Sequence, residues 1–187
     1  SEFGWFYPIS WFFLFLFPMP LAYHIEAAIG LLLAAVSTYL LGRAWGMSRM
    51  SAFVGGYTYA LSPFVFATSL FINFADVFWV LPATLLALER VAQRHYQYLV
   101  LFVVAAAAGI LSGHPHIVLV LAFAASIFTV FRVSWVIRDH GFLVATGFLS
   151  LLVFGTIVAF MMGAVRILPS LALTEISTRA GGIEFAD

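Results

Sequence analysis

The sequence predicts an all-α fold, a polytopic transmembrane helix bundle of about six spans preceded by an N-terminal interfacial aromatic segment. Hydrophobic residues make up 64% of the 187 positions, charged residues make up 9%, and the mean hydropathy is +1.10. Soluble domains are about half apolar and a quarter charged. Apolar runs of about twenty residues recur, each long enough to cross a hydrocarbon layer roughly 30 Å thick. Helices are expected because a spanning segment must satisfy its own backbone hydrogen bonds.

Charge and cysteine content exclude several other classes of protein. The formal net charge is zero, and the eight basic residues are all arginines that form no continuous run. Nucleic acid is therefore not expected as a partner. Cysteine is absent, which excludes disulfides and thiolate chemistry. No signal peptide is predicted, and the start at Ser1 without an initiating methionine leads us to expect a piece of a longer protein.

Residues 1–20 are predicted to form an outer-face interfacial or re-entrant segment. The stretch 5–17 is almost wholly aromatic or aliphatic, but Pro8 interrupts it and Pro18 closes it. The uninterrupted part is too short to span a membrane. Its tryptophans and tyrosine suit the headgroup region, where amphipathic rings gather.

Residues 21–165 are predicted to form the six-span bundle. The expected spans are 21–42, 51–70, 74–89, 98–111, 115–133 and 142–165. Pro82 predicts a kink in the third span. The small residues at 105–109 predict close helix packing in the fourth span. Residues 166–187 are expected to form an outer-face segment of mixed composition that continues into a further region.

The arginines fall in alternate turns of this arrangement. The six that share one side are Arg43, Arg49, Arg90, Arg94, Arg132 and Arg138. Arginine in short loops marks the cytoplasmic side of a membrane. The opposite side, which receives residues 112–116 and both termini, is therefore predicted to be extracytoplasmic.

The stretch Ser112-Gly113-His114-Pro115-His116 is the most polar interruption of the apolar runs. One interpretation is a plain turn, with Pro115 at the first position of the next helix. The other adds a function, because a helix N-terminus beside an imidazole suits a phosphate. A metal site is not predicted, since residues two apart point to nearly opposite sides of a helix or strand.

Other polar residues on the same side are weaker candidates. Asp76 is interpreted first as a helix-capping or first-turn carboxylate, and second as a carboxylate facing a polar cavity. Arg166 is either a snorkelling residue or a ligand for phosphate. Arg179 is four residues from Glu175, so a helix-surface ion pair is the first interpretation. Further polar or aromatic residues are interpreted as interfacial or packing groups: His24, Glu26, Tyr57 and Tyr59.

Several short segments, in order, resemble the YfhO-like bacterial membrane proteins. These segments are Phe6-Tyr7-Pro8, Leu41-Gly42-Arg43-Ala44-Trp45-Gly46-Met47-Ser48, Tyr59-Ala60-Leu61-Ser62-Pro63, Leu81-Pro82 with Leu88-Glu89-Arg90, Ser112-Gly113-His114-Pro115-His116, and Leu168-Pro169 with Ser177-Thr178-Arg179. The Gly-His-Pro turn is the most telling, although the family usually carries glutamine where this chain has His116.

That family looks like a branch of the GT-C glycosyltransferase superfamily. The resemblance implies transfer of a sugar from a polyprenyl-phosphate donor on the outer face of the bacterial inner membrane. It also implies a divalent metal in many members, although no cofactor is evident from the residues themselves. The catalytic acid of GT-C proteins generally follows the first span, so the catalytic residue is expected upstream of Ser1 and the chain is expected to be a fragment of a larger enzyme. The alternative is a shortened relative that has kept the scaffold.

The substrate or phosphate-binding candidates are His114, His116, Asp76, Arg166 and Arg179, and the expected partners are membrane lipids and a polyprenyl-phosphate sugar. The alternative function is a noncatalytic subunit or assembly factor, with protein partners in a larger membrane complex, because these residues hold no complete acid/base or metal constellation. A transporter ranks third, since Pro82 is the only clear interruption within a span.

Overall fold

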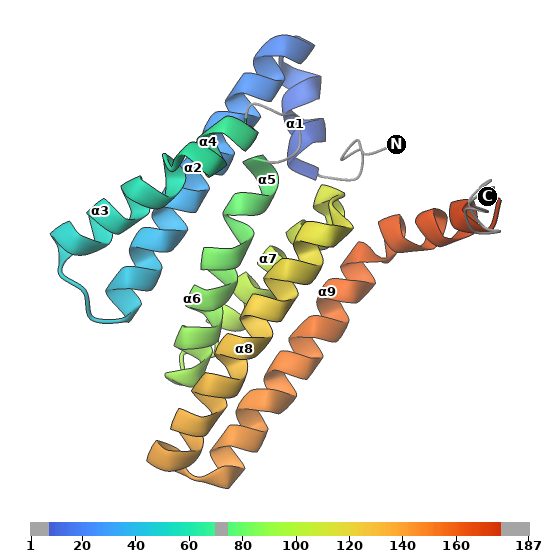
Figure 1. Ribbon diagram of the computed structural model, residues 1–187. Coiled ribbons are helices and arrows are strands. Elements are labelled where there is room, and N and C mark those ends of the chain that lie inside the picture. The colour runs from blue at the N-terminus through green and yellow to red at the C-terminus, as the bar shows by residue number, and fades with distance from the viewer. Residues whose placement is uncertain (1–7, 70–74, 177–187) are drawn as a thin grey trace, which may run out of the picture.

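A computed structural model describes residues 8–69 and 75–176, and every regular element in these ranges is a helix (Figure 1). The helices are α1 (Pro8–Leu16), α2 (Met19–Ala44), α3 (Arg49–Ala60), α4 (Pro63–Ser69), α5 (Ala75–Phe78), α6 (Val80–Ala92), α7 (Tyr98–Ser112), α8 (Pro115–His140) and α9 (Phe142–Ile176). The predicted all-α class is confirmed for the described part of the chain.

Within residues 8–69 and 75–176, three helices are both long and apolar enough to cross a membrane: Met19–Ala44, His116–His140 and Phe142–Ser170. Helix α7 is apolar but has only 15 residues, and α6 has 13. Both are shorter than the roughly 20 residues that a spanning helix needs. The structure thus has the helices of a membrane protein, with three rather than six of the predicted spans at full length.

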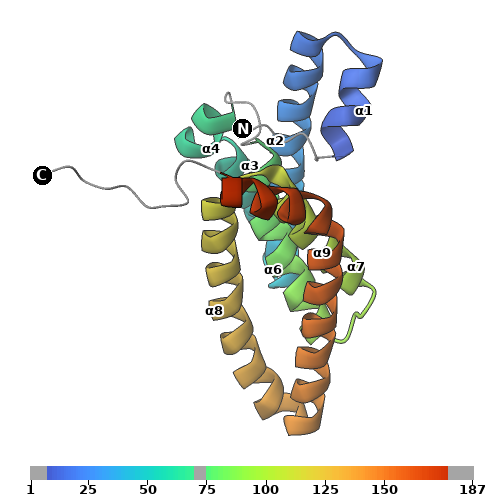
Figure 2. The ribbon, with the colours of Figure 1, turned by 90° about the vertical axis from the view of Figure 1, so that its right-hand side faces the viewer.

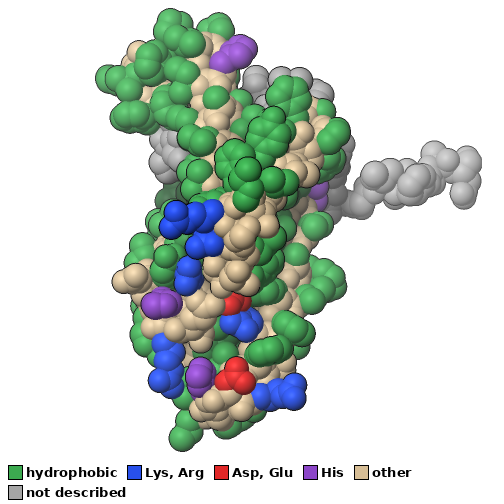
Figure 3. All heavy atoms as spheres, turned by 90° about the vertical axis from the view of Figure 1, so that its left-hand side faces the viewer, with side chains coloured by type: hydrophobic (Ala, Val, Ile, Leu, Met, Phe, Trp, Pro, Cys, Tyr) green, Lys and Arg blue, Asp and Glu red, His purple; other side chains and the backbone are tan. Residues whose placement is uncertain are grey.

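The bundle has two distinct ends. Helices α6, α7, α8 and α9 run side by side, and α2 packs against α6 (Figures 1 and 2). In Figure 1 the turn that follows α8 is the lowest, the turns that follow α2 and α6 lie above it in the lower half of the molecule, and the turn between α7 and α8 lies toward the opposite end. We call these the arginine end, after the six arginines grouped above, and the histidine end, after His114 and His116. Figure 3 shows arginine side chains gathered over the lower half of one face.

The predicted second span, 51–70, is not one continuous helix. Helix α3 ends at Ala60, and α4 begins at Pro63. Proline has no backbone N–H and clashes with the carbonyl four residues earlier, so a helix ends shortly before it. The Ser62 hydroxyl accepts a hydrogen bond from the Val65 N–H at 3.4 Å and helps to start α4.

Pro82 causes a break rather than the predicted kink within a span. The break falls at Trp79, between α5 and α6, and Pro82 lies in the first turn of α6. Because Pro82 has no N–H, it cannot donate to the carbonyl of Phe78. That carbonyl accepts the Tyr59 hydroxyl at 2.8 Å instead. Tyr59, interpreted from the sequence as packing bulk, therefore has a specific hydrogen-bonding role.

Small residues lie at two contacts of α7. Gly109, from the run at 105–109, is buried, and a Cβ added to it would lie 3.3 Å from Cγ1 of Val80 on α6. The contact of α7 with α9 depends instead on glycines of α9, since a Cβ added to Gly163 would overlap Ile110. The close approach of the run at 105–109 is therefore seen at Gly109, against α6.

Both ends of the described chain are helical. Helix α9 continues past Arg166 to Ile176, with Pro169 inside it, so residues 166–176 of the expected C-terminal segment extend the last helix. Its last turns point away from the earlier part of the helix (Figure 1), as a proline inside a helix causes. Helix α1 folds back onto the first turns of α2. Residues 1–7 and 177–187 lie outside the described part.

Candidate functional site

The turn at the histidine end has the local structure that its sequence predicts. Gly113 follows α7 in the left-handed conformation, with φ +98°, and Pro115 is the first residue of α8. Glycine adopts this conformation without strain, and proline suits the first helical position. The Ser112 hydroxyl is fully buried and donates to the Gly109 carbonyl at 2.7 Å. A rigid turn therefore joins the C-terminus of α7 to the N-terminus of α8.

Arg166 reaches this turn from α9. Its Nη1 donates to the carbonyl of Leu111 at 2.5 Å. The last carbonyls of α7 carry the negative end of the helix dipole, which attracts a cation. A Cβ added to Gly113 would lie 2.8 Å from the same Nη1. Gly113 thus serves two purposes, since it permits the positive φ and leaves room for the guanidinium group.

The two histidines of the turn lie closer together than the sequence analysis expects. Their rings contact edge to face, with centroids 5.9 Å apart. The expectation that they point to nearly opposite sides is wrong because His114 lies before the helix, with φ −112° and ψ 79°. The i, i+2 geometry of a helix therefore does not apply to the pair. His114 is 5% exposed, whereas His116 is exposed.

An apolar cavity of about 560 Å³ lies among α6, α7, α8 and α9. In Figure 2, α8 and α9 diverge from their shared turn toward the histidine end, with α6 between them in this view. On α8 the cavity is lined by residues from Val130 up to Val118, and its lining on α7 includes Gly109 and Ile110. One end of the cavity therefore lies next to the histidine turn.

Hydroxyl groups in the cavity wall are satisfied by their own helices. Ser126 donates to the Ala122 carbonyl at 2.7 Å, and Thr129 donates to the Ala125 carbonyl at 2.8 Å. The Thr156 hydroxyl of α9 donates to the Leu152 carbonyl at 2.8 Å. Because these donors are occupied, the wall is apolar and suits a hydrocarbon chain better than a polar solute.

The structure brings together three of the five candidate residues: His114, His116 and Arg166. The backbone of Asp76 belongs to α5, but its side chain is outside the described part of the structure. Arg179 also lies outside the described residues, and with it the expected ion pair to Glu175. The predictions for these two residues therefore remain predictions.

The sequence does not reveal a buried polar cluster at the arginine end. Glu89, the last residue of the expected third span, lies in α6 and is 3% exposed. Its Oε1 accepts two hydrogen bonds, one from Nη2 of Arg132 at 2.5 Å and one from Nε2 of Gln93 at 2.7 Å. Arg132 was expected in a turn, and it lies within α8. Nothing in the local sequence marks this pair, because its members are 43 positions apart.

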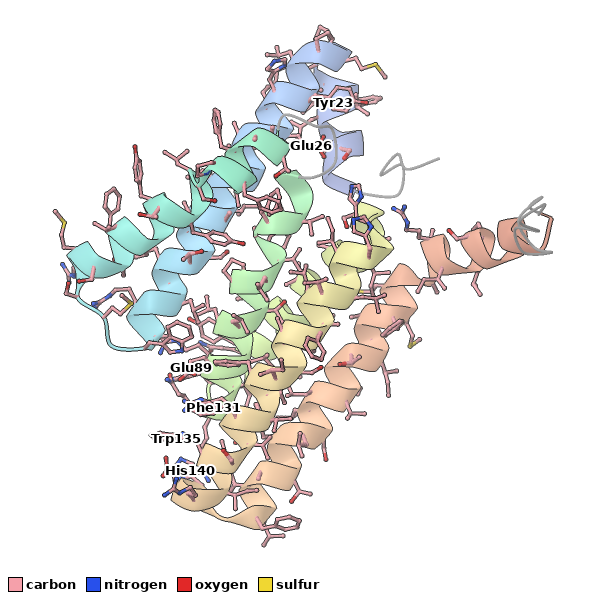
Figure 4. All side chains as sticks on the ribbon, viewed as in Figure 1. Tyr23, Glu26, Glu89, Phe131, Trp135 and His140 are labelled. Carbon is pink, nitrogen blue, oxygen red and sulfur yellow. The ribbon has the colours of Figure 1, made fainter. Side chains whose placement is uncertain are left out.

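A second buried carboxylate, Glu26, lies where α1 packs on α2 (Figure 4). It accepts a hydrogen bond from the Ser10 hydroxyl. The sequence interpretation of Glu26 as an interfacial group is wrong in the described structure, where it is 7% exposed. The signal that could have found it is its spacing from Ala22 and Gly30, buried residues four positions away on the same helix face.

The described residues do not form a donor set for the divalent ion that the family resemblance implies. Nowhere in residues 8–69 and 75–176 do three or more His, Cys, Asp or Glu side chains converge where they could hold a metal ion. No step of the function proposed below is therefore derived through a metal.

Comparison of the chain with protein-family models, with curated proteins and with solved structures finds no match in any of the three.

Proposed function

We propose that this chain is the membrane portion of a GT-C-like glycosyltransferase, which transfers a sugar from a polyprenyl-phosphate donor on the extracytoplasmic face of a bacterial inner membrane. One observation carries the proposal: a cluster of arginine and histidine side chains lies at the end of an apolar cavity. A polyprenyl phosphate has the matching form, an anionic head on a long hydrocarbon chain. The sequence resemblance to YfhO-like proteins points to the same substrate class.

The head and tail subsites are close enough for one ligand. Val118 in the cavity wall is two residues from His116, which is about 3 Å along a helix. Phe160 in the wall is six residues from Arg166, about 9 Å along α9. From Val118 to Val130 the cavity extends about 18 Å along α8. A hydrocarbon chain can therefore lie in the cavity while its phosphate reaches the turn.

The turn offers several donors to a phosphate. A guanidinium group has five N–H donors, and the bond to Leu111 uses one of those of Arg166. The first turn of α8 adds backbone N–H groups at the positive end of a helix dipole. His116 is exposed beside them. These groups would bind the donor phosphate and stabilise the charge that develops on it as the sugar leaves.

The catalytic base is not assigned to any described residue. The buried carboxylate of Glu26 is bonded to Ser10 between α1 and α2, and that of Glu89 lies at the arginine end.

Sugar transfer from a polyprenyl-phosphate donor by the full-length protein tests the proposal. Arg166→Ala and His116→Ala are each expected to lower kcat/KM about tenfold or more, because a hydrogen bond to a charged group contributes about 1.5–3 kcal/mol. His140→Ala, which removes an exposed histidine at the other end, is the matched control. Thermal unfolding of each variant separates loss of the site from loss of the fold. Unchanged rates in both site variants would remove these residues from the site.

The second candidate, a noncatalytic subunit or assembly factor, is favoured by one observation on α8. None of its most apolar 18-residue window is buried, and Leu119 and Phe123, which do not line the cavity, are each about 70% exposed. This face contacts either lipid or another protein. Purification with stoichiometric partner proteins, and no activity after addition of donor lipid, would favour the subunit over the enzyme.

A further inference from the structure

Of the six arginines at the arginine end, three form side-chain contacts within the fold and three have exposed side chains that project from it. The three with contacts are Arg43, Arg90 and Arg132. Arg43 donates to the Met47 carbonyl at 2.5 Å, Arg90 donates to Gln93 at 3.1 Å and lies over the Tyr98 ring at 5.8 Å, and Arg132 is paired with Glu89. Each of these guanidinium groups fixes a helix or a turn.

The other three, Arg49, Arg94 and Arg138, are exposed. The ion pair of Arg132 with Glu89 is the one salt bridge within the described ranges, so no described carboxylate pairs with any of the projecting three. The six arginines share this end with two carboxylates, Glu89 and Asp139, and Glu89 is buried. The exposed surface of the arginine end is therefore strongly positive, as one face of it shows in Figure 3.

Arg94 occupies a backbone position at which glycine would be the ordinary residue. Its φ is +67°, the one positive φ of a non-glycine residue in the described part of the chain. It follows the C-terminus of α6, and its N–H donates to the Val91 carbonyl at 2.9 Å. Left-handed backbone is unfavourable for a residue with a Cβ. An arginine at such a position is consistent with a use for its side chain.

Aromatic residues surround these arginines. Trp45, Tyr96 and Trp135 are 52%, 53% and 46% exposed, and the sequence places each within a few residues of an arginine at this end. Figure 4 shows Trp135 near His140, toward the end of α8. Tryptophan and tyrosine favour the headgroup region of a bilayer, because one part of the ring is apolar and another forms hydrogen bonds. These aromatic rings therefore favour a position of the arginine end in the headgroup region of a bilayer.

We propose that the arginine end binds the headgroups of anionic phospholipids through Arg49, Arg94 and Arg138. Guanidinium groups bind phosphate through paired N–H donors. Because the three lie in separate turns, they present a surface to the lipid layer around the bundle rather than one closed pocket. This inference rests on the membrane character of the helices and not on the proposed glycosyltransferase activity.

The test uses the purified full chain in phosphatidylcholine vesicles that contain a minor fraction of phosphatidylglycerol. Enrichment of phosphatidylglycerol next to the protein is measured with spin-labelled lipid. Each arginine removed is expected to lower the relative affinity about fivefold, since a basic residue at a membrane surface contributes about 1 kcal/mol. The triple change to glutamine should abolish enrichment, whereas the triple change to lysine should retain most of it. Added salt should weaken the enrichment of the unaltered protein.

Two further variants separate lipid binding from folding. Arg94→Gly should lower phosphatidylglycerol enrichment without lowering the thermal midpoint, because glycine relieves the left-handed backbone. Asp139→Asn, which removes a negative charge from the same surface, should raise enrichment. The proposal is overturned if the triple glutamine variant retains enrichment at an unchanged midpoint. It is also overturned if enrichment falls only in variants whose midpoint falls.

Discussion

Replacing Arg132 with methionine is expected to lower the free energy of unfolding by about 3–5 kcal/mol, the usual cost of breaking a buried ion pair from one side. Glu89 is 3% exposed, and Arg132 is its one cationic partner among the described residues. Without the guanidinium group, the carboxylate keeps only the amide of Gln93, at 2.7 Å. An uncompensated charge then remains among α2, α6 and α8.

Replacing Glu89 with leucine should lower the free energy of unfolding by less than replacing Arg132 does. The Arg132 side chain is 20% exposed, so it can turn toward water when Glu89 is replaced with leucine. The double variant, Glu89→Leu with Arg132→Met, should recover much of the stability lost in Arg132→Met, because it buries no unpaired charge. Thermal and denaturant unfolding in detergent measure all three. Equal, additive losses in the two single variants would show that the pair is not coupled.

Replacing Gly56 with leucine is expected to cost about 3 kcal/mol, because an oversized side chain would enter a tightly packed contact. A Cβ at Gly56 would lie 2.5 Å from the Ala35 carbonyl oxygen, which belongs to the backbone of α2. Backbone cannot move aside as a flexible side chain can. Ala52 and Ala60, one turn away on each side, are also buried, so α3 contacts α2 along a row of small residues.

The adjacent Gly55 provides a matched control. A Cβ added there meets nothing within 4 Å. Gly55→Leu should therefore be neutral, or slightly stabilising because leucine has the higher helix propensity. Unfolding in detergent and cross-linking between α2 and α3 measure the difference. A Gly56→Leu variant as stable as Gly55→Leu would show that the close approach of the two helices is not required.

Features set by local sequence were predictable. Gly113 and Pro115 determine the turn between α7 and α8 through their own backbone preferences, and the structure confirms it. Long apolar runs similarly predict α2, α8 and α9. Pro82 indicated where a helix would be disturbed, but not whether it would bend or end, and the break before Pro63 was not predicted. That outcome depends on partners that the local sequence does not show. The Tyr59 hydroxyl, for example, donates a hydrogen bond to the carbonyl of Phe78, 19 positions away.

Features set by contacts between distant residues were not predictable. Glu89 sits beside Arg90 in a sequence that resembles a polar turn, and only the packing of α8 shows that it is buried against Arg132. Arg166 was equally compatible with snorkelling and with anion binding. Its bond to Leu111 spans 55 positions and places it beside the two histidines. The residues His114, His116 and Arg166 were therefore proposed as candidates from the sequence, but their arrangement around the turn was only partly predictable.

Photolabelling with a polyprenyl phosphate that carries its reactive group along the hydrocarbon chain tests the central claim most directly. The account predicts labels on cavity residues such as Leu121, Ala125 and Leu152, with loss of the label when unmodified polyprenyl phosphate competes. Labels confined to outward residues of α8 such as Leu119 and Phe123, and insensitive to the competitor, would contradict it.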